Sequence, residues 1–120
     1  MKFLLAQINP VVGDLEGNAK KILFTASKAS STSADLVLTP ELSLWGYPAN
    51  DLLLKKNLIK NQYQILDQLA LDINKKYGSL SITVGIAEII NDSFFPNLYN
   101  SIALLERGEW KIIARKIILP

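Results

Sequence analysis

The sequence predicts an α/β protein with two helices and about five strands. Two short apolar runs are followed by chain-breaking residues, as short buried strands are: residues 2–8 by Asn9-Pro10, and residues 36–39 by Pro40. Two longer stretches repeat apolar residues at intervals of three and four, which is typical of amphipathic helices. Residues 82–114 are instead rich in β-branched and apolar residues and are divided by turn-forming residues, which favours consecutive strands.

The first half of the chain predicts a strand, a helix and a second strand. We expect the first strand over Lys2–Ile8 and the first helix over Ala19–Ala29, with capping-type residues in Asp14–Asn18. The second strand is expected over Leu36–Thr39, because Pro40 stops it. This order of elements predicts a parallel crossover.

The second half predicts an apolar loop, a long helix and three strands joined by hairpins. Pro40–Asp51 contains two prolines and a glycine, so it is a shaped loop, and its apolar residues make it a candidate pocket wall. The helix is expected over Lys56–Tyr77, where Gly78 closes the periodic pattern. The strands are expected over Ile82–Ile89, Leu98–Leu105 and Trp110–Ala114.

Composition narrows the possible functions. Of the 120 residues, 49% are apolar and 20% are charged, which is typical of one globular domain or part of one. The net charge of +2 comes from scattered residues, so neither nucleic acid nor a membrane is an expected partner. Without cysteine or histidine, the chain has no disulfide and no thiolate or imidazole metal ligand. No apolar run resembles a signal peptide or a membrane span, so we expect a cytoplasmic protein.

Two charged residues stand where α/β folds often place catalytic groups. Glu41 follows the proline that ends the second strand, and the carboxyl ends of parallel strands are favoured positions for active sites. Lys116 comes just past the predicted last strand, among apolar neighbours that draw its stem inward. Position alone leaves a second interpretation open, in which both residues are surface charges.

Several short motifs follow one another along the chain. They are Ala6–Asp14 with Asn18, Pro40-Glu41-Leu42, Gly46-Tyr47-Pro48 with Asp51–Leu54, Tyr99-Asn100-Ser101, and Lys116 with Leu119-Pro120. By the order and spacing of the first, second and last motifs, the chain resembles the nitrilase-like carbon-nitrogen hydrolases. The other two motifs make it similar, within that superfamily, to the glutaminase domain of glutamine-dependent NAD synthetases.

The resemblance implies roles for individual residues. The family uses a glutamate, a lysine and a cysteine, and the first two correspond to Glu41 as general base and Lys116 as the group that stabilises the oxyanion. Tyr47 becomes a candidate for the substrate pocket. The nucleophilic cysteine has no counterpart in residues 1–120, and the hydroxyls of Ser43 and Ser101 lack a histidine that could activate them.

The resemblance also implies a fold and an activity. The family fold is a four-layer sandwich of two αββα halves, and residues 1–120 would form its first part, truncated before the nucleophile and the synthetase domain. Such a part is expected to expose apolar surface or to self-associate. The complete protein is expected to be a homo-oligomer that hydrolyses glutamine to supply ammonia for ATP-dependent amidation of nicotinate adenine dinucleotide to NAD.

The same resemblance assigns ATP and Mg to the synthetase domain of the parent chain, which is the expected intramolecular partner, and no cofactor to residues 1–120. The 120-residue chain alone is expected to be inactive. Two alternatives stay open: a stand-alone amidase of the same superfamily, and a non-catalytic fragment or interaction module.

Overall fold

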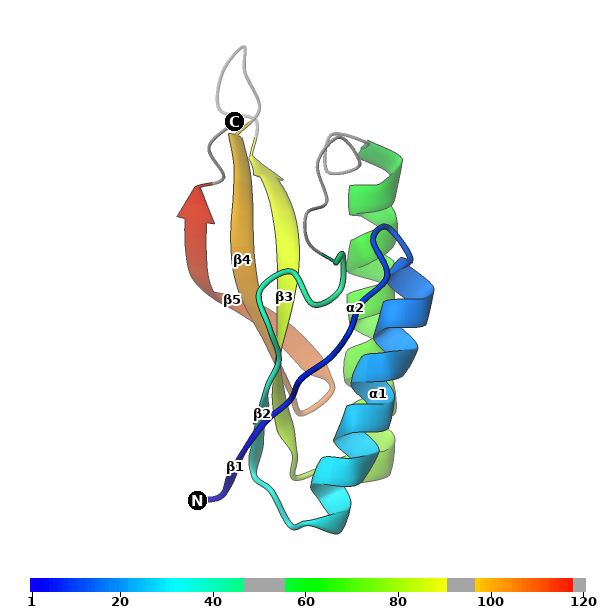
Figure 1. The fold of residues 1–120 in the computed structure, drawn as a ribbon, viewed down its shortest axis with the longest axis vertical. Helices are drawn as coiled ribbons and strands as arrows, with labels where there is room; N and C mark the ends of the chain where they lie inside the picture. The colour runs from blue at the N-terminus through cyan, green and yellow to red at the C-terminus, as the bar shows by residue number, and fades with distance from the viewer. Residues whose placement is uncertain (47–55, 91–96, 118–120) are drawn as a thin grey trace.

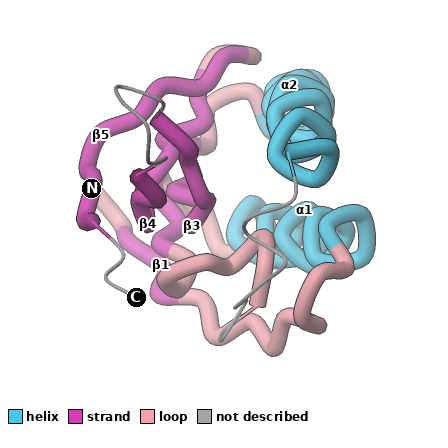
Figure 2. Tube along the Cα trace, turned by 90° about the horizontal axis from the view of Figure 1, so that it is seen from above, coloured by secondary structure: helices cyan, strands magenta, loops and turns pink. Residues whose placement is uncertain are grey.

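The computed structural model describes residues 1–46, 56–90 and 97–117. Within these ranges, two helices lie on one face of a five-stranded sheet, so that a helix layer covers a sheet layer (Figure 1; Figure 2). The strand order is β1-β2-β3-β4-β5, in which the first three strands are parallel and the last two pairings are antiparallel. The α/β class and the strand-helix-strand crossover predicted from the sequence are confirmed.

The first crossover is shorter in its strands than the pattern predicted. Strand β1 covers Phe3–Leu5 and pairs with β2, Leu36–Leu38. The first strand therefore ends before Ile8, because β2 offers a partner of only three residues. Helix α1 covers Leu15–Ser31, and the side chain of its N-cap residue Asp14 accepts a hydrogen bond from the Gly17 amide at 3.0 Å.

Helix α2 covers Lys56–Tyr77, the range that the apolar periodicity predicted. Its buried residues recur at three- and four-residue steps and turn one face of the helix to the core: Ile59, Gln62, Leu66, Leu69 and Ile73. At the edge of this face, the ring of Tyr63 stacks on Trp110 with centroids 5.7 Å apart. The Trp110 indole N–H also donates to Asp67 at 2.7 Å, so α2 holds the beginning of the last strand.

The remaining strands are β3 (Ser81–Ile90), β4 (Asn97–Glu106) and β5 (Glu109–Ile117). Arg107 and Gly108 connect β4 to β5 with φ angles of 55° and 81°, which is the left-handed backbone of a tight hairpin turn. A β-bulge interrupts the pairing between Ile102 and Ala103. Strand β5 extends beyond the predicted Trp110–Ala114, so Lys116 lies inside the strand and not past its end. The prediction was wrong here because Asn100 of β4 pairs with Lys116.

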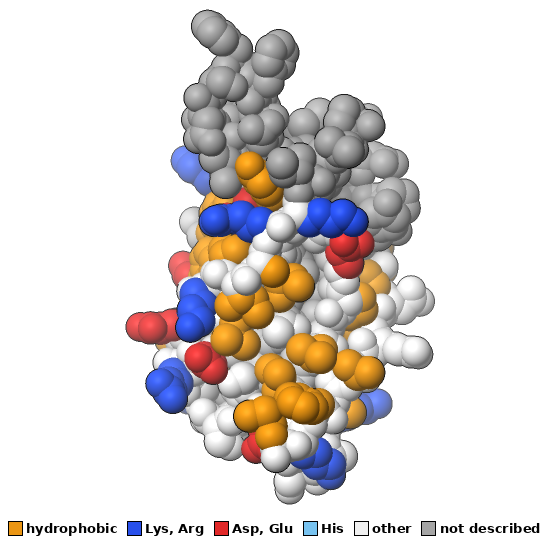
Figure 3. Space-filling model, turned by 90° about the vertical axis from the view of Figure 1, so that its left-hand side faces the viewer, with side chains coloured by type: hydrophobic (Ala, Val, Ile, Leu, Met, Phe, Trp, Pro, Cys, Tyr) orange, Lys and Arg blue, Asp and Glu red, His pale blue; other side chains and the backbone are white. Residues whose placement is uncertain are grey.

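The two faces of the sheet differ in their surroundings. The face toward the helices is the core, with Val37, Ile82, Val84 and Ile86 fully buried. On the opposite face, which we call the open face, Phe3, Leu5 and Ile102 are 59%, 75% and 38% exposed. Hydrophobic side chains gather on this side of the molecule (Figure 3). The expectation of exposed apolar surface is thus confirmed for the described residues.

Candidate active site

Glu41 begins a turn that the surrounding structure holds tightly. Strand β2 ends at Leu38, and the turn covers residues 41–45. The side chain of Glu41 is exposed, whereas those of Leu42, Ser43, Leu44 and Trp45 are buried. Leu42 has a left-handed φ of 49°, a conformation that costs a non-glycine residue about 1–3 kcal/mol and persists only where contacts enforce it. The turn therefore presents the carboxylate from a fixed backbone.

Strand β3 enforces this turn through Gly85. The Ser43 hydroxyl accepts a hydrogen bond from the Gly85 amide at 2.9 Å, and the Leu44 amide donates to the Gly85 carbonyl at 3.1 Å. A Cβ on Gly85 would lie 2.6 Å from the Pro40 carbonyl oxygen and 2.8 Å from the Ser43 nitrogen. The turn can approach β3 this closely because residue 85 has no side chain.

Two polar side chains anchor the end of the turn. The Asn18 amide group donates to the carbonyls of Val11 at 2.8 Å and Leu44 at 2.9 Å, and its oxygen accepts from the Val11 amide at 2.8 Å. Gln62 of α2 accepts from the Trp45 indole and from the Ala87 amide, and it donates to the Ala87 carbonyl at 2.6 Å. Sequence reasoning missed Gln62, although a glutamine on the apolar stripe of a helix signals a buried hydrogen-bonding role.

The register of the sheet places Lys116 on the open face. Lys116 lies opposite Asn100, which lies opposite Ala87, two residues along β3 from Gly85. Directly opposed residues share a face, and alternate residues of a strand return to it. Gly85 and Ala87 alternate along β3 with the core residues Val84 and Ile86, so they point to the open face. Asn100 and Lys116, which lie in line with Ala87 across the sheet, belong to the same face.

The turn that carries Glu41 packs on this same side, because it occupies the space that a Gly85 side chain would take. The structure therefore brings the Glu41 turn and Lys116 to one side of the sheet, on either side of β4. That their charged groups meet at one substrate stays a prediction.

The remaining residues singled out in the sequence are Tyr47, Ser43 and Ser101. Tyr47 lies outside the described residues. Ser43 and Ser101 are both fully buried and hydrogen-bonded, which suits structural hydroxyls.

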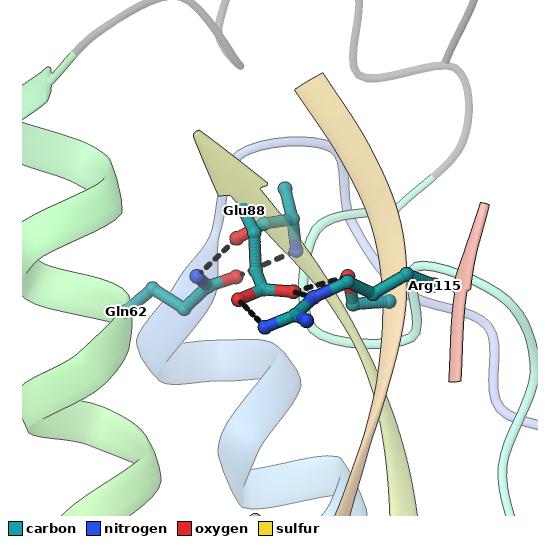
Figure 4. A network of polar contacts seen from close by, with 5 residues as sticks. Gln62, Glu88 and Arg115 are labelled. Atoms are coloured by element: carbon teal, nitrogen blue, oxygen red, sulfur yellow. Dashed lines mark hydrogen bonds and ion pairs between the residues drawn. The ribbon is translucent and has the colours of Figure 1, made fainter. Parts of the chain in front are cut away.

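A second charged group lies on the helix-facing side. Glu88 of β3 is 8% exposed; its Oε1 accepts from the Ser101 hydroxyl at 2.6 Å and from Arg115 Nε at 2.8 Å, and its Oε2 accepts from Arg115 Nη2 at 3.3 Å (Figure 4). Burial acts to raise the pKa of Glu88, but the hydrogen bonds from Arg115 and Ser101 and the guanidinium charge outweigh it, so the pKa lies below its usual value. The carboxylate is thus held ionised between three neighbouring strands.

A separate pocket in the structure is lined by neither of the two proposed catalytic residues. A pocket of about 510 Å³ opens between the β1 segment and α1, lined by residues such as Leu5, Gln7, Lys20 and Phe24, and neither Glu41 nor Lys116 lines it. Over residues 1–46, 56–90 and 97–117, no three histidine, cysteine, aspartate or glutamate side chains come together to hold a metal ion. No helix in the described part of the chain is long and apolar enough to cross a membrane.

Comparisons with known proteins show which proteins the chain is similar to. A glutamine-dependent NAD(+) synthetase from Synechocystis sp. is 39% identical over 119 residues, which are 97% of this chain and 21% of that protein. The counterpart from Aquifex aeolicus is 38% identical over 120 residues, which are 100% of this chain and 20% of that protein. The chain therefore spans about a fifth of the length of the curated relatives that it matches.

Solved structures share the fold. Glutamine-dependent NAD+ synthetase from Acinetobacter baumannii, in complex with ADP, superposes with a TM-score of 0.78 at 31% identity, over 96% of this chain and 20% of that one. An amidase from Nesterenkonia sp. superposes with a TM-score of 0.70 at 22% identity, over 98% of this chain and 42% of that one, and shows the shared fold. The family model for carbon-nitrogen hydrolases matches residues 5–120. The chain therefore belongs to the carbon-nitrogen hydrolase family.

Proposed function

We propose that residues 1–120 form the first part of the glutaminase unit of a glutamine-dependent NAD synthetase. The observation that carries this proposal is the 35–39% identity to such synthetases across nearly the whole chain. It is supported by the position of the Glu41 turn on the same side of the sheet as Lys116. In the complete protein, glutamine is hydrolysed to glutamate, and the ammonia amidates nicotinate adenine dinucleotide to NAD. ATP and Mg act in the synthetase domain of the same parent chain.

The two charged residues supply complementary chemistry. A cysteine thiol from outside residues 1–120 loses its proton to Glu41 as its sulfur attacks the carboxamide carbon. Lys116 stabilises the negative oxygen of the tetrahedral species with a fixed positive charge. The C–N bond then breaks, Glu41 returns the proton to the leaving nitrogen as ammonia forms, and water hydrolyses the thioester to glutamate. Because residues 1–120 contain no cysteine, the chain alone releases no ammonia from glutamine.

The fixed turn suits this role for Glu41. A general base must stay within hydrogen-bond reach of the proton that it abstracts, so backbone mobility at its position lowers the rate. Hydrogen bonds with Gly85, Asn18 and Gln62 hold three consecutive residues of the turn, Ser43, Leu44 and Trp45. The exposed carboxylate on a buried turn is therefore prepared for proton transfer.

A stand-alone amidase is the second candidate, because a Nesterenkonia amidase shares the fold over 98% of this chain. The full-length protein carrying residues 1–120 separates the two functions. The synthetase must form NAD from nicotinate adenine dinucleotide, ATP and Mg with glutamine as the nitrogen donor. An amidase releases ammonia from amides but forms no NAD under the same conditions, and that result would overturn the proposal.

A further inference from the structure

The bulge in β5 decides which of two adjacent cations reaches the open face. From the hairpin turn to Ala103, each β4 residue pairs regularly with β5, ending at Ala103 with Ile112. The next pair joins Ile102 to Ala114 and leaves Ile113 without a partner. Regular pairing would instead have joined Asn100 to Arg115. The skipped residue therefore exchanges the faces of Arg115 and Lys116.

Little else in this part of the strand specifies the register. Residues 113–116 are all exposed, so no buried apolar pattern distinguishes one face from the other. In the described chain, β5 pairs with β4 only and is an edge of the sheet. The contacts of Trp110 with α2 hold the strand before the bulge and not after it.

The hydrogen bonds of Glu88 with Ser101 and Arg115 distinguish the bulged register from the regular one. Arg115 lies opposite Ser101, and from there its guanidinium gives Glu88 two hydrogen bonds, at 2.8 and 3.3 Å (Figure 4). In the regular register, Lys116 would lie opposite Tyr99, the residue that pairs with Glu88. Glu88 would then face a lysine, which is a point charge and lacks the planar, two-point match of arginine to a carboxylate.

We infer that Glu88 and Ser101 are positioning residues, which hold Arg115 on the helix-facing side and thereby select the bulged register that presents Lys116 to the active site. The inference rests on the proposed function for what Lys116 does, but not for how its strand is held. Glu88 lies on the helix-facing side of the sheet, opposite the face to which Lys116 belongs. It acts through Arg115, across three adjacent strands.

The register is read directly from cross-strand nuclear Overhauser contacts in the isotope-labelled 120-residue protein. The original sequence gives contacts from Asn100 to Lys116 alone. With Glu88→Gln, a second set from Asn100 to position 115 appears, because the amide binds the guanidinium about tenfold more weakly than the carboxylate does. Glu106→Gln is the matched control: its carboxylate also accepts from a serine of β3, Ser81, at 3.0 Å, but near the hairpin end. It keeps one register.

Arg115→Lys covers the case in which Glu88→Gln does not fold, since it keeps the charge and removes the two-point contact. It too gives the second set of contacts. A single, bulged register in whichever of these variants folds overturns the inference.

In the full-length protein, both variants lower kcat for glutamine hydrolysis in proportion to the slipped population and leave KM unchanged. If the original protein hydrolyses no glutamine, the proposed function fails while the contacts still decide the register. If the second register appears and kcat stays normal, Lys116 is not positioned in this way.

Discussion

Replacing Gly85 with alanine tests how the turn of Glu41 is held. The added Cβ would lie 2.6 Å from the Pro40 carbonyl oxygen and 2.8 Å from the Ser43 nitrogen. Both are backbone atoms, so no side chain can rotate away to make room. The turn must move off β3, and the hydrogen bonds that join Gly85 to Ser43 and Leu44 lengthen or break.

The magnitude follows from these two effects. Overpacking a tight site costs about 1–3 kcal/mol, and each lost hydrogen bond costs about 0.5–1.5 kcal/mol. The two costs overlap, because moving the turn relieves the clash as it breaks the bonds. We therefore expect the free energy of unfolding to fall by about 2–4 kcal/mol. With a urea m-value of about 2 kcal/mol/M, the midpoint of unfolding falls by about 1–2 M.

Urea unfolding followed by tryptophan fluorescence measures this change, because Trp45 is fully buried on the turn itself. Gly78→Ala is the matched control: its Cβ would meet one backbone oxygen, of Asn74, at 3.1 Å, and we expect a loss below about 1 kcal/mol. If Gly85→Ala unfolds at the same urea concentration as Gly78→Ala, the turn is not held against β3 as described.

Three further predictions concern the anchor, the buried carboxylate and the open face. Asn18→Ala removes three hydrogen bonds and should lower the free energy of unfolding by about 2–4 kcal/mol. Substitution of the exposed Gln68 by alanine is the control and should change this free energy by less than about 0.5 kcal/mol. Equal effects of the two substitutions would show that Asn18 does not anchor the turn. Because the pKa of Glu88 is lowered in the folded state, its stabilisation is complete above the ordinary value of 4.5 and is lost as the pH falls through the lower folded pKa. Glu88→Gln should therefore flatten the acid limb of the plot of stability against pH, and an unchanged limb would refute this. Ile102→Lys adds a charge to the open face and should reduce self-association in sedimentation experiments. If the unsubstituted protein is already monomeric, the open face does not mediate self-association.

The sequence predicted helix α2 correctly because its apolar residues repeat over six turns, which leaves few alternative assignments. It predicted β1 too long, because a run of apolar residues shows burial but not the length of the partner strand. Glu41 could be located from Pro40 and the end of the preceding strand. The exposure of Glu41 on an otherwise buried turn could not be predicted, because the contacts of Gly85 with that turn join residues 42 positions apart.

The bulge in β5 could not be predicted from the sequence. Ile112 and Ile113 are both apolar and β-branched, so the alternation does not mark which of them is skipped. The sequence predicts a last strand over the apolar and β-branched residues up to Ala114, whereas β5 continues through Lys116 to Ile117. The Glu88–Arg115 pair was also missed, because residues 27 positions apart in sequence carry no local signal of contact.

We propose that Glu41 and Lys116 perform amide hydrolysis in the full-length protein. Steady-state glutaminase rates of Glu41→Ala and Lys116→Ala test this, with Glu109→Ala and Lys111→Ala as matched controls, since these two exposed charges lie near the hairpin end of β5. We expect kcat to fall on the order of a hundredfold or more in the first pair, because general-base and oxyanion contributions have that size. The controls should keep nearly the original rate, and all four variants should melt cooperatively. Near-normal glutamine hydrolysis by folded Glu41→Ala would contradict the account.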